Sequence, residues 1–492
     1  MALEKFGLIF KDNRCEIKDK EKILSKLKVI LGEKNVSTRE IDLIAYSKDS
    51  TLITLNWRIQ GQLAALPDLI TWPENNDQIS KILKLANEEK IPIIPYGEGS
   101  GVVGGAIPIY GGIIIDMKKF NKILEINDKD LTVTVQAGMN GMNLERYLNA
   151  KGYTCGHIPQ SIYMSSVGGW IAHRAAGQFS TKYGKIEDIV LGLEIILPQG
   201  EIIKLKTIIR AATGPQFDKL FIGGEGTLGI VTKATLKIWP YPEKRELISY
   251  AFPTIEDSLE AIRNILRNQI YPAVIRIYDT SETSRHFPQI KEAKDKVMAV
   301  FVCEGNERLV NLEGIITREK CEDNKGANCG EEPVEHWFET RFRVTETSFG
   351  PPYKIVFDTI EVSVMWEHAA ELYHLVLDSV KKVKGNLHIT AHASHFYPNG
   401  VGFYFTFSGV ATGGKSDFEF YQECWDAVID ACVKAGGSIA HHHGIGINRA
   451  RWMEKEWGKA LRSLIDIKNL LDPNNILNPG KTYFPPEKGG AK

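Results

Sequence analysis

The 492-residue sequence has no uninterrupted apolar stretch whose length approaches the about 18 residues that a transmembrane helix needs. Its N-terminus, MALEKFGLIFKDNRCEIKDKEK, also has no apolar segment long enough for a signal peptide. Net charge is nearly absent, because 60 Lys and Arg residues balance 61 Asp and Glu residues to give −1 at pH 7. With no basic excess and no long basic run, nucleic acid is not an expected partner. We therefore predict a cytoplasmic protein and leave open peripheral contact between a surface patch and a membrane.

Cysteine is scarce and scattered, with seven residues in the whole chain. They are Cys15, Cys155, Cys303, Cys321, Cys329, Cys424 and Cys432. An odd number of dispersed cysteines in a long chain favours reduced thiols over a disulfide framework. The segment CEDNKGANC, which holds Cys321 and Cys329, could form a redox loop or half of a metal site. Two unrelated loop thiols are the commoner origin of such a lone pair.

The length of the chain predicts two or three domains, because a single core rarely grows beyond about 250–300 residues. Strand-like and helix-like segments alternate over residues 68–240 and predict an α+β block whose sheet is largely antiparallel. The Pro-punctuated segment KIWPYPEKRE predicts a domain boundary. We expect an N-terminal helical arm at 1–64, a first domain at 65–240, a second at 241–420 and a C-terminal helical segment at 421–492. Within these, the polar stretch 304–335 is expected to be an insertion or a mobile loop, and 450–471 a single helix.

Three glycine-rich loops lie in the first domain. The first, IPYGEGSGVVGGAIP (94–108), follows a predicted strand, and glycine lets backbone N–H groups approach phosphate oxygens closely. It is neither a Walker loop, since no Gly-Lys-Ser/Thr follows, nor a good Rossmann fingerprint. Taken alone, it suits a structural turn equally well. Two more loops, SSVGGWIAHRAAGQFSTKYGKIEDIVLG (165–192) and FIGGEGTLGIVTKATLKIWP (221–240), favour a long, planar ligand contacted mostly by backbone, such as a dinucleotide.

These motifs resemble the FAD-binding domain of the vanillyl-alcohol-oxidase (PCMH-type) flavoprotein family. The resemblance is carried by PYGEGSG, SSVGGW, YGKIEDIVLGLEIILPQG and GEGTLGIVTKATLKIWP, and LLDPNNILNPGK is similar to the C-terminal signature of glycolate oxidase and D-lactate dehydrogenase members. TGPQFDKLFIGGEGTLG, PAVIRIYD, YPNGVGFYF and GGSIAHHHGIG are similar to the alkyldihydroxyacetonephosphate synthase branch. The resemblance implies an α+β fold with a two-lobed FAD-binding domain at 65–240 and an α/β cap (substrate) domain with an antiparallel sheet at 241–420. The C-terminal segment would carry a histidine run back to the FAD domain.

The resemblance also implies the residues that contact FAD. They are Pro95, Tyr96, Gly97, Glu98, Gly99, Ser100 and Gly101 in the first loop; Pro159, Ser161, Ser165, Ser166, Gly168, Gly169 and Ala172 around the second; and Glu225, Gly226, Gly229, Ile230 and Val231 in the third. Some family members tether the flavin through a histidine of the first loop. This loop has no His or Cys, and Ser100 stands near that place, so we expect non-covalent FAD. A homodimer is usual for the branch.

Catalytic residues are implied in the cap and in the run AGGSIAHHHGIGINR. They are Tyr404 as acid/base, His441, His442 and His443 of the run, Arg276 against a substrate phosphate, and His392, which stands where the animal synthases carry another arginine. A purely structural role stays open for single residues: a strand tyrosine often packs in a core, and an arginine is often a salt-bridge residue. In an extended run only His441 and His443 would share a side. A metal site with His392 and His395 is conceivable, but we expect proton chemistry and no metal.

Two enzyme reactions fit such a pocket. In one, a hydroxy substrate loses a proton to the His/Tyr pair and a hydride to FAD, and the electrons pass to oxygen, a quinone or an acceptor protein. In the other, no net electrons move, and an acyloxy group beside a ketone is exchanged for an alkoxy group. A third possibility is a flavin-carrying subunit of an electron-transfer complex, although a pure carrier needs no acid/base group. The sequence predicts an FAD enzyme acting on a small hydroxy or keto substrate, with the substrate itself undetermined.

Overall fold

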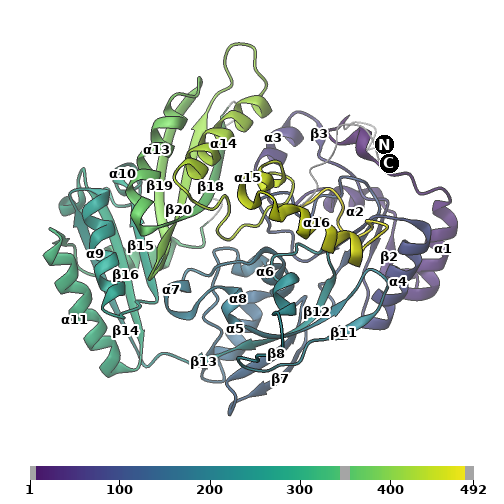
Figure 1. Ribbon diagram of the computed structural model, residues 1–492, viewed down its shortest axis with the longest axis horizontal. Coiled ribbons are helices and arrows are strands. Elements are labelled where there is room, and N and C mark those ends of the chain that lie inside the picture. Colours follow the sequence, from purple (N-terminus) through teal and green to yellow (C-terminus); the bar gives the residue numbers. More distant parts are fainter. Residues whose placement is uncertain (1–6, 344–354, 483–492) are drawn as a thin grey trace.

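The computed structural model describes residues 7–343 and 355–482, which form two lobes (Figure 1). No helix in these two ranges is long and apolar enough to cross a membrane. Three main sheets form in the described residues, two in the N-terminal lobe and one larger sheet in the cap, besides two two-stranded sheets. Each sheet has its own apolar core, as expected for a chain of this length.

The smaller sheet of the N-terminal lobe has the strand order β2-β4-β6-β5, with β4, β6 and β5 parallel. Its strands are β2 (Val36–Ser37), β4 (Leu69–Thr71), β6 (Ile113–Asp116) and β5 (Ile93–Tyr96), and helices α1 (Lys20–Leu31) and α4 (Asn76–Glu89) pack beside it. Helix α4 starts where the Asn75 side chain accepts a hydrogen bond from the Gln78 N–H, and its buried Ile79, Ile82 and Leu83 recur at helical spacing. Strand β5 leads directly into the first glycine loop.

The larger sheet of this lobe is antiparallel, as predicted, with the order β11-β10-β12-β8-β7. Its strands are β11 (Ile202–Lys204), β10 (Val190–Ile196), β12 (Ile230–Lys237), β8 (Thr132–Gln136) and β7 (Ile123–Asn127). Helices α5 (Gly141–Asn149), α6 (Val167–His173) and α8 (Ile186–Ile189) belong to the same core. The predicted hairpin at the PQG turn is present, because β10 pairs antiparallel with β11.

The cap is a seven-stranded antiparallel sheet with the order β17-β14-β16-β15-β19-β20-β18. Its strands are β17 (Ala327–Asn328), β14 (Lys244–Phe252), β16 (Val297–Gly305), β15 (Val274–Tyr278), β19 (Asn386–Tyr397), β20 (Gly400–Gly409) and β18 (Val356–Met365). Helices α9 (Ile255–Arg267), α11 (Glu307–Asp323), α13 (Ala369–Lys381) and α14 (Asp417–Lys434) cover one face. Short helices α7 (Ser180–Tyr183), α10 (Thr280–His286) and α12 (Glu332–Thr340) lie against part of the other face.

Several segments differ from the sequence expectations. The stretch 304–335 is not an insertion or a loop: it forms the end of β16, helix α11, β17 and the start of α12, and Cys321 is a buried residue of α11. Residues 450–471 are not one helix, because Gly458, with φ of 50°, separates α15 (Met453–Trp457) from α16 (Ala460–Leu471). All seven cysteines are free thiols.

The expected domain limits cut across packed elements at two places. Strand β2 completes the β4 sheet, and α3 (Ile53–Ile59) places Trp57 in the cap core, so residues 7–64 contribute to both lobes. The limit at residue 420 falls inside α14, which packs on β18. The C-terminal segment lies on the N-terminal lobe (Figure 1), where Ile93 donates to the Ile476 carbonyl at 2.7 Å. The short remaining elements are α2 (Glu40–Ala45), β1 (Gly7–Leu8) with β3 (Gln62–Leu63), and β9 (Tyr153–Thr154) with β13 (Trp239–Pro240).

Candidate active site

One row of side chains crosses the centre of the cap sheet. Strand register places Tyr278 opposite His392, His392 opposite Tyr404, and Tyr404 opposite Glu361. Because side chains alternate along a strand, these four residues share one face, while neighbours such as Phe403 point into the helix-covered core on the other. The polar face of the sheet is therefore built from strands that are far apart in the sequence.

The Glu361 carboxylate anchors the histidine run. Its Oε1 accepts hydrogen bonds from the backbone N–H groups of His441 at 3.2 Å, His442 at 3.1 Å and His443 at 2.8 Å. The guanidinium of Arg449, which is 0% exposed, also binds this carboxylate. Burial is the largest single influence and would raise the pKa of Glu361, but Arg449, His443 and His442 together outweigh it and hold that pKa well below its usual range. An ionised, buried glutamate thus fixes three successive residues in a single turn of backbone.

This anchoring points the three histidines in different directions. His443 Nε2 lies 3.1 Å from the Tyr404 hydroxyl, and its Nδ1 lies 3.2 Å from Glu361 Oε2. His441 and His442 instead face one another, with their Nδ1 atoms 2.9 Å apart. The expectation that His441 and His443 share a side is therefore wrong, because it assumed an extended backbone. The convergence of three N–H groups on one oxygen curls the run instead.

Tyr404 is the residue to which most of this face is connected. Its hydroxyl accepts a hydrogen bond from Thr359 Oγ1 at 3.3 Å as well as contacting His443. The ring of His392 stacks on it with centroids 4.7 Å apart and planes at 14°. Burial raises the pKa of Tyr404, so the hydroxyl carries its proton at neutral pH.

His392 and Arg276 extend the site toward α10. His392 Nδ1 lies 3.5 Å from Glu282 Oε2, and burial followed by the charge of Arg276 lowers the pKa of His392 to about 4. The Arg276 guanidinium lies over the Tyr278 ring, 4.9 Å from its centroid. Its Nε is buried and meets no hydrogen-bond partner among the described residues. An arginine beside a neutral histidine, with donor capacity left over, suits an anionic group.

The three glycine loops meet in the N-terminal lobe, as expected of a shared ligand site. A Cβ atom on Gly97 would lie 2.5 Å from Ser166 Oγ, so this glycine allows the first loop to touch the second. The Glu225 N–H donates to the Ala172 carbonyl at 3.0 Å and joins the third loop to the second. From the C-terminal segment, Asn478 Nδ2 donates to the Gly105 carbonyl at 2.9 Å and to the Glu225 carbonyl at 2.8 Å.

The predicted cofactor residues fall into two groups. The half-buried ones line the loops: Pro95, Gly97, Glu98, Gly99, Ser100 and Gly101 at the first, Ser161, Gly168, Gly169 and Ala172 at the second, and Gly226 and Val231 at the third. The others have buried side chains or no space for one: Tyr96, Pro159, Ser165, Ser166, Glu225, Gly229 and Ile230. Of these, Ser165 accepts from the Trp170 indole at 2.8 Å, Ser166 caps α6, and Ile230 packs in the core. The Glu225 carboxylate binds the backbone of Ile445 and Gly446, just beyond the histidine run.

The first loop has the features that a dinucleotide phosphate requires. The backbone N–H groups of Glu98, Gly99, Ser100 and Gly101 meet no acceptor within the part of the chain that the structure describes. The buried His173 Nε2 is also without a hydrogen-bond partner there, and a Cβ on Gly105 would lie 2.9 Å from it. Free N–H groups in a glycine loop are donors placed for an anion, whereas His173, whose Nδ1 donates to the Gly169 carbonyl at 3.1 Å, presents Nε2 to this loop as an acceptor. The free N–H groups of the loop fit the pyrophosphate of FAD.

Comparisons with known proteins agree with this geometry. The family model of the FAD binding domain matches residues 67–206, and that of the C-terminal domain of FAD linked oxidases matches residues 241–482. The alkyldihydroxyacetonephosphate synthase of Caenorhabditis elegans is 32% identical over 453 residues, which cover 84% of this chain and 76% of the relative. The chain belongs to the FAD-linked oxidase family. The glycolate oxidase subunit GlcD of Bacillus subtilis is 27% identical over 456 residues, which cover 90% and 93% of the two chains.

The fold is shared as well. A solved structure of an alkyldihydroxyacetonephosphate synthase superimposes with a TM-score of 0.79 at 26% identity, covering 97% of this chain and 88% of that one. The family, the α+β two-domain fold and FAD as cofactor are thereby confirmed. The relatives are named as a synthase and an oxidase subunit, and this chain is likewise an FAD-dependent enzyme.

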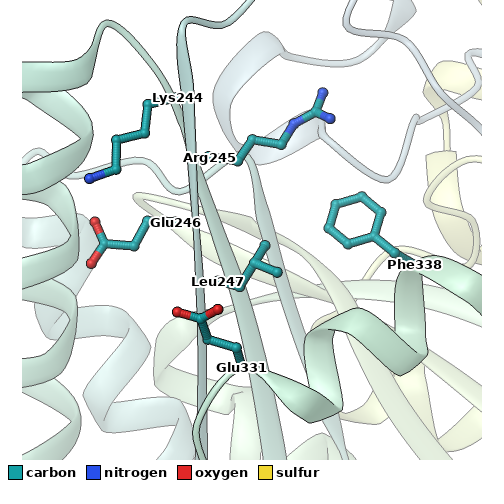
Figure 2. A pocket seen from close by; sticks show the side chains of 6 residues that line it. All are labelled: Lys244, Arg245, Glu246, Leu247, Glu331 and Phe338. Carbon is teal, nitrogen blue, oxygen red and sulfur yellow. The ribbon is translucent and has the colours of Figure 1, made fainter.

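A cavity of about 500 Å³ lies elsewhere, where β14 meets α12 (Figure 2). It is lined by Lys244, Arg245, Glu246, Leu247, Glu331 and Phe338. Along the strand, Lys244 and Glu246 point to one side, and Arg245 and Leu247 to the other. None of these six residues is among the predicted site residues.

Sequence reasoning missed the residues that hold the site together. Glu361 and Arg449 anchor the run, Ser180 binds His395, and Lys185 donates to the His441 carbonyl. The one available signal was Glu361 itself, the only charged residue in the mainly apolar strand segment IEVSVM. A carboxylate in a buried strand must find partners, which marks it as part of a polar network.

Proposed function

We propose that Tyr404 and His443 transfer a proton to or from a small hydroxy or keto substrate beside the flavin, in chemistry related to that of the alkyldihydroxyacetonephosphate synthases. One observation carries this proposal: the Tyr404 hydroxyl lies 3.1 Å from His443 Nε2, within hydrogen-bond reach, and the Glu361 carboxylate lies 3.2 Å from His443 Nδ1 in a close contact that lacks hydrogen-bond geometry. Acid/base groups must lie within hydrogen-bond reach of one another to pass a proton. FAD, when bound, supplies the electron-accepting or electrophilic ring against which such a substrate reacts.

Each of these three residues has a distinct part. Tyr404 holds its proton at neutral pH, because burial raises its pKa, and it can donate that proton to a substrate oxygen. His443 can replace the proton through Nε2 or accept one from Tyr404. Glu361 stays ionised and faces the Nδ1 of His443, which favours a proton on Nδ1 and leaves Nε2 as the exchanging nitrogen. Arg276 completes the pocket by binding an anionic group of the substrate, either phosphate or carboxylate.

The second candidate function is a 2-hydroxyacid dehydrogenase. A specific observation favours it: the donor that Arg276 leaves free suits a carboxylate as well as a phosphate, and the glycolate oxidase subunit covers almost the same length of chain. In this reaction the same Tyr404–His443 pair removes the hydroxyl proton, and the electrons leave through a quinone or an acceptor protein. We also propose that FAD is bound without a covalent link, because the first loop contains neither His nor Cys.

The test is anaerobic mixing of the flavin-loaded enzyme with single substrates, followed by the visible absorbance of the flavin. The panel contains D- and L-2-hydroxy acids, glycerol phosphates and an acyl-dihydroxyacetone phosphate. Acid release from the acyl ketone phosphate without lasting bleaching identifies synthase chemistry. Lasting bleaching by a hydroxy acid identifies a dehydrogenase. Failure of every compound, or full activity of Tyr404→Phe protein, would contradict the proposal.

A further inference from the structure

Three histidines of the pocket converge in a way that the Tyr404–His443 pair does not use. His395, His441 and His442 each offer one ring nitrogen, and these atoms all lie within 4.8 Å of one another. His395 comes from β19, and the other two come from the turn that Glu361 holds. Two of the rings are buried and the third is half-buried. The cluster joins the cap sheet to the loop that returns toward the N-terminal lobe.

The outer nitrogens of two of these rings are already committed. His395 Nδ1 lies 2.7 Å from Ser180 Oγ, and His441 Nε2 lies 3.0 Å from the Tyr397 hydroxyl. When a hydroxyl oxygen accepts the outer N–H, the lone pair is placed on the opposite nitrogen of the ring. That nitrogen is Nε2 in His395 and Nδ1 in His441, and both belong to the converging side. Metal-binding histidines are oriented by outer hydrogen bonds of this kind.

We propose that His395, His441 and His442 bind a divalent transition-metal ion, with Zn²⁺ as the representative case. Three imidazoles are a complete protein ligand set for a zinc site that keeps its fourth position open for water or a substrate oxygen. The ring of His442 also stacks on Tyr404 with centroids 5.9 Å apart, so the ion would lie next to the proposed proton-transfer pair. The site would add an oxygen-binding, Lewis-acid group to a pocket otherwise made of acids and bases.

The protonation and spacing of the rings agree with this assignment. Burial lowers the pKa of all three histidines well below the usual value, so the rings are neutral and keep lone pairs for a metal. The Nδ1 atoms of His441 and His442 are 2.9 Å apart, whereas a tetrahedral ion with Zn–N bonds of about 2.0–2.1 Å holds its ligands about 3.3 Å apart. Side-chain rotations of a few tenths of an ångström cover that difference for this pair, whereas nitrogens of the cluster that lie up to 4.8 Å apart must approach by about 1.5 Å when the ion binds.

The charges around the cluster are balanced. Lys185 is the nearest cation, and it is paired with Glu187 at 3.4 Å and lies against the His441 carbonyl. Burial lowers the pKa of Lys185, which weakens its opposition to a bound cation. On the other side, the Glu361 carboxylate lies beneath the backbone of the same turn. Arg276 and His392 complete the surroundings on the cap sheet, and His392 is neutral at pH 7.

The test measures metal binding directly and does not rely on turnover. Tag-free, flavin-loaded enzyme is stripped with a chelator, titrated with Zn²⁺ by calorimetry, and analysed for bound metal by mass spectrometry after desalting. We expect one tight equivalent of zinc in the wild type and at least a roughly 100-fold weaker affinity in His395→Gln and His442→Gln, as loss of a ligand requires. His392→Gln, which changes the neighbouring histidine of the same strand, should bind zinc as the wild type does. Flavin absorbance and circular dichroism check that each variant is folded.

Two results would overturn the metal site. One is a wild-type protein that binds no zinc, cobalt or copper above the level of His395→Gln. The other is equal zinc binding by the wild type and both cluster variants, which would indicate a site elsewhere. The metal site lies in the same pocket as the proposed proton-transfer pair but does not depend on it. Zinc binding by Tyr404→Phe protein separates the two, because that variant should lose turnover and keep the metal.

Discussion

The Tyr404 hydroxyl lies 3.1 Å from Nε2 of His443, although 39 residues separate them in the chain. Their approach depends on Glu361, which stands opposite Tyr404 in the strand register and also accepts the N–H of His443. One buried carboxylate thereby aligns a residue of the cap sheet with a residue of the returning loop. The catalytic geometry is therefore a property of the strand pairing between β18 and β20 as much as of the histidines.

Replacing Tyr404 by phenylalanine should lower kcat by about 10²- to 10⁴-fold, the usual contribution of a general acid or base. The ring is retained, so FAD binding and thermal stability should change little. Steady-state kinetics and flavin content measure the two effects. The matched control is Tyr373→Phe, on a helix that covers the opposite face of the same sheet, and it should keep wild-type kinetics. An inactive Tyr404→Phe protein that has lost its flavin would contradict the assignment of Tyr404 to catalysis.

Glu361→Gln should destabilise the fold by about 3–5 kcal/mol at pH 7, because it leaves the fully buried Arg449 without its carboxylate. The folded-state pKa of Glu361 is depressed, so its stabilisation is complete above the unfolded pKa of about 4.3 and is lost as the pH falls further. The difference in unfolding free energy between wild type and variant should therefore shrink below about pH 4.

Urea unfolding at several pH values measures this difference. The control is Glu260→Gln, which removes one partner of the more exposed Arg263 pair and should cost at most about 1 kcal/mol. A Glu361→Gln penalty as small as that of the control, or one that stays constant down to about pH 3, would show that the Glu361–Arg449 pair does not anchor the loop.

Much of the fold and part of the site could be predicted from the sequence. The three glycine loops were recognisable by composition, and the β10–β11 hairpin by its PQG turn. Tyr404 and the histidine run were found through family motifs. These signals are local, so they can be detected without knowledge of which segments pack together.

The different roles of the three histidines in the run could not be predicted. They depend on Glu361, whose contribution follows only from long-range strand register, and on three N–H groups that turn toward one oxygen. The assumption of an extended run therefore paired His441 with His443, whereas the fold pairs His441 with His442. The single helix expected at 450–471 failed for a local reason, since the apolar pattern continues through Gly458 while its positive φ breaks the helix.

Gly99→Val should yield a folded protein without flavin. Gly99 has a φ of 71°, and a Cβ there would lie 2.1 Å from the Tyr96 hydroxyl. The loop must therefore shift, and its N–H groups no longer point at the pyrophosphate. Gly61→Val is the matched control, because Gly61 has a φ of 73° but nothing within 4 Å of the added Cβ. The ratio of flavin to protein absorbance separates the two variants. A fully yellow Gly99→Val protein would refute the phosphate assignment of the first loop.

Arg276→Met should weaken the binding of an anionic substrate and raise its KM by about 10- to 100-fold, while kcat falls less. A neutral analogue that lacks the phosphate or carboxylate should be affected little, because it never engaged the guanidinium. Burial and, as the second cause, the charge of Arg276 lower the pKa of His392 to about 4. Because Arg276→Met removes that charge, the pKa of His392 should rise in the variant. Hydrogen–deuterium exchange at the imidazole C2 position, followed by mass spectrometry, reports that pKa for a single residue. The control is Arg263→Met, on the solvent side of α9, which should change neither value. Equal losses for the anionic substrate and its neutral analogue would show that Arg276 shapes the pocket instead of binding the anion.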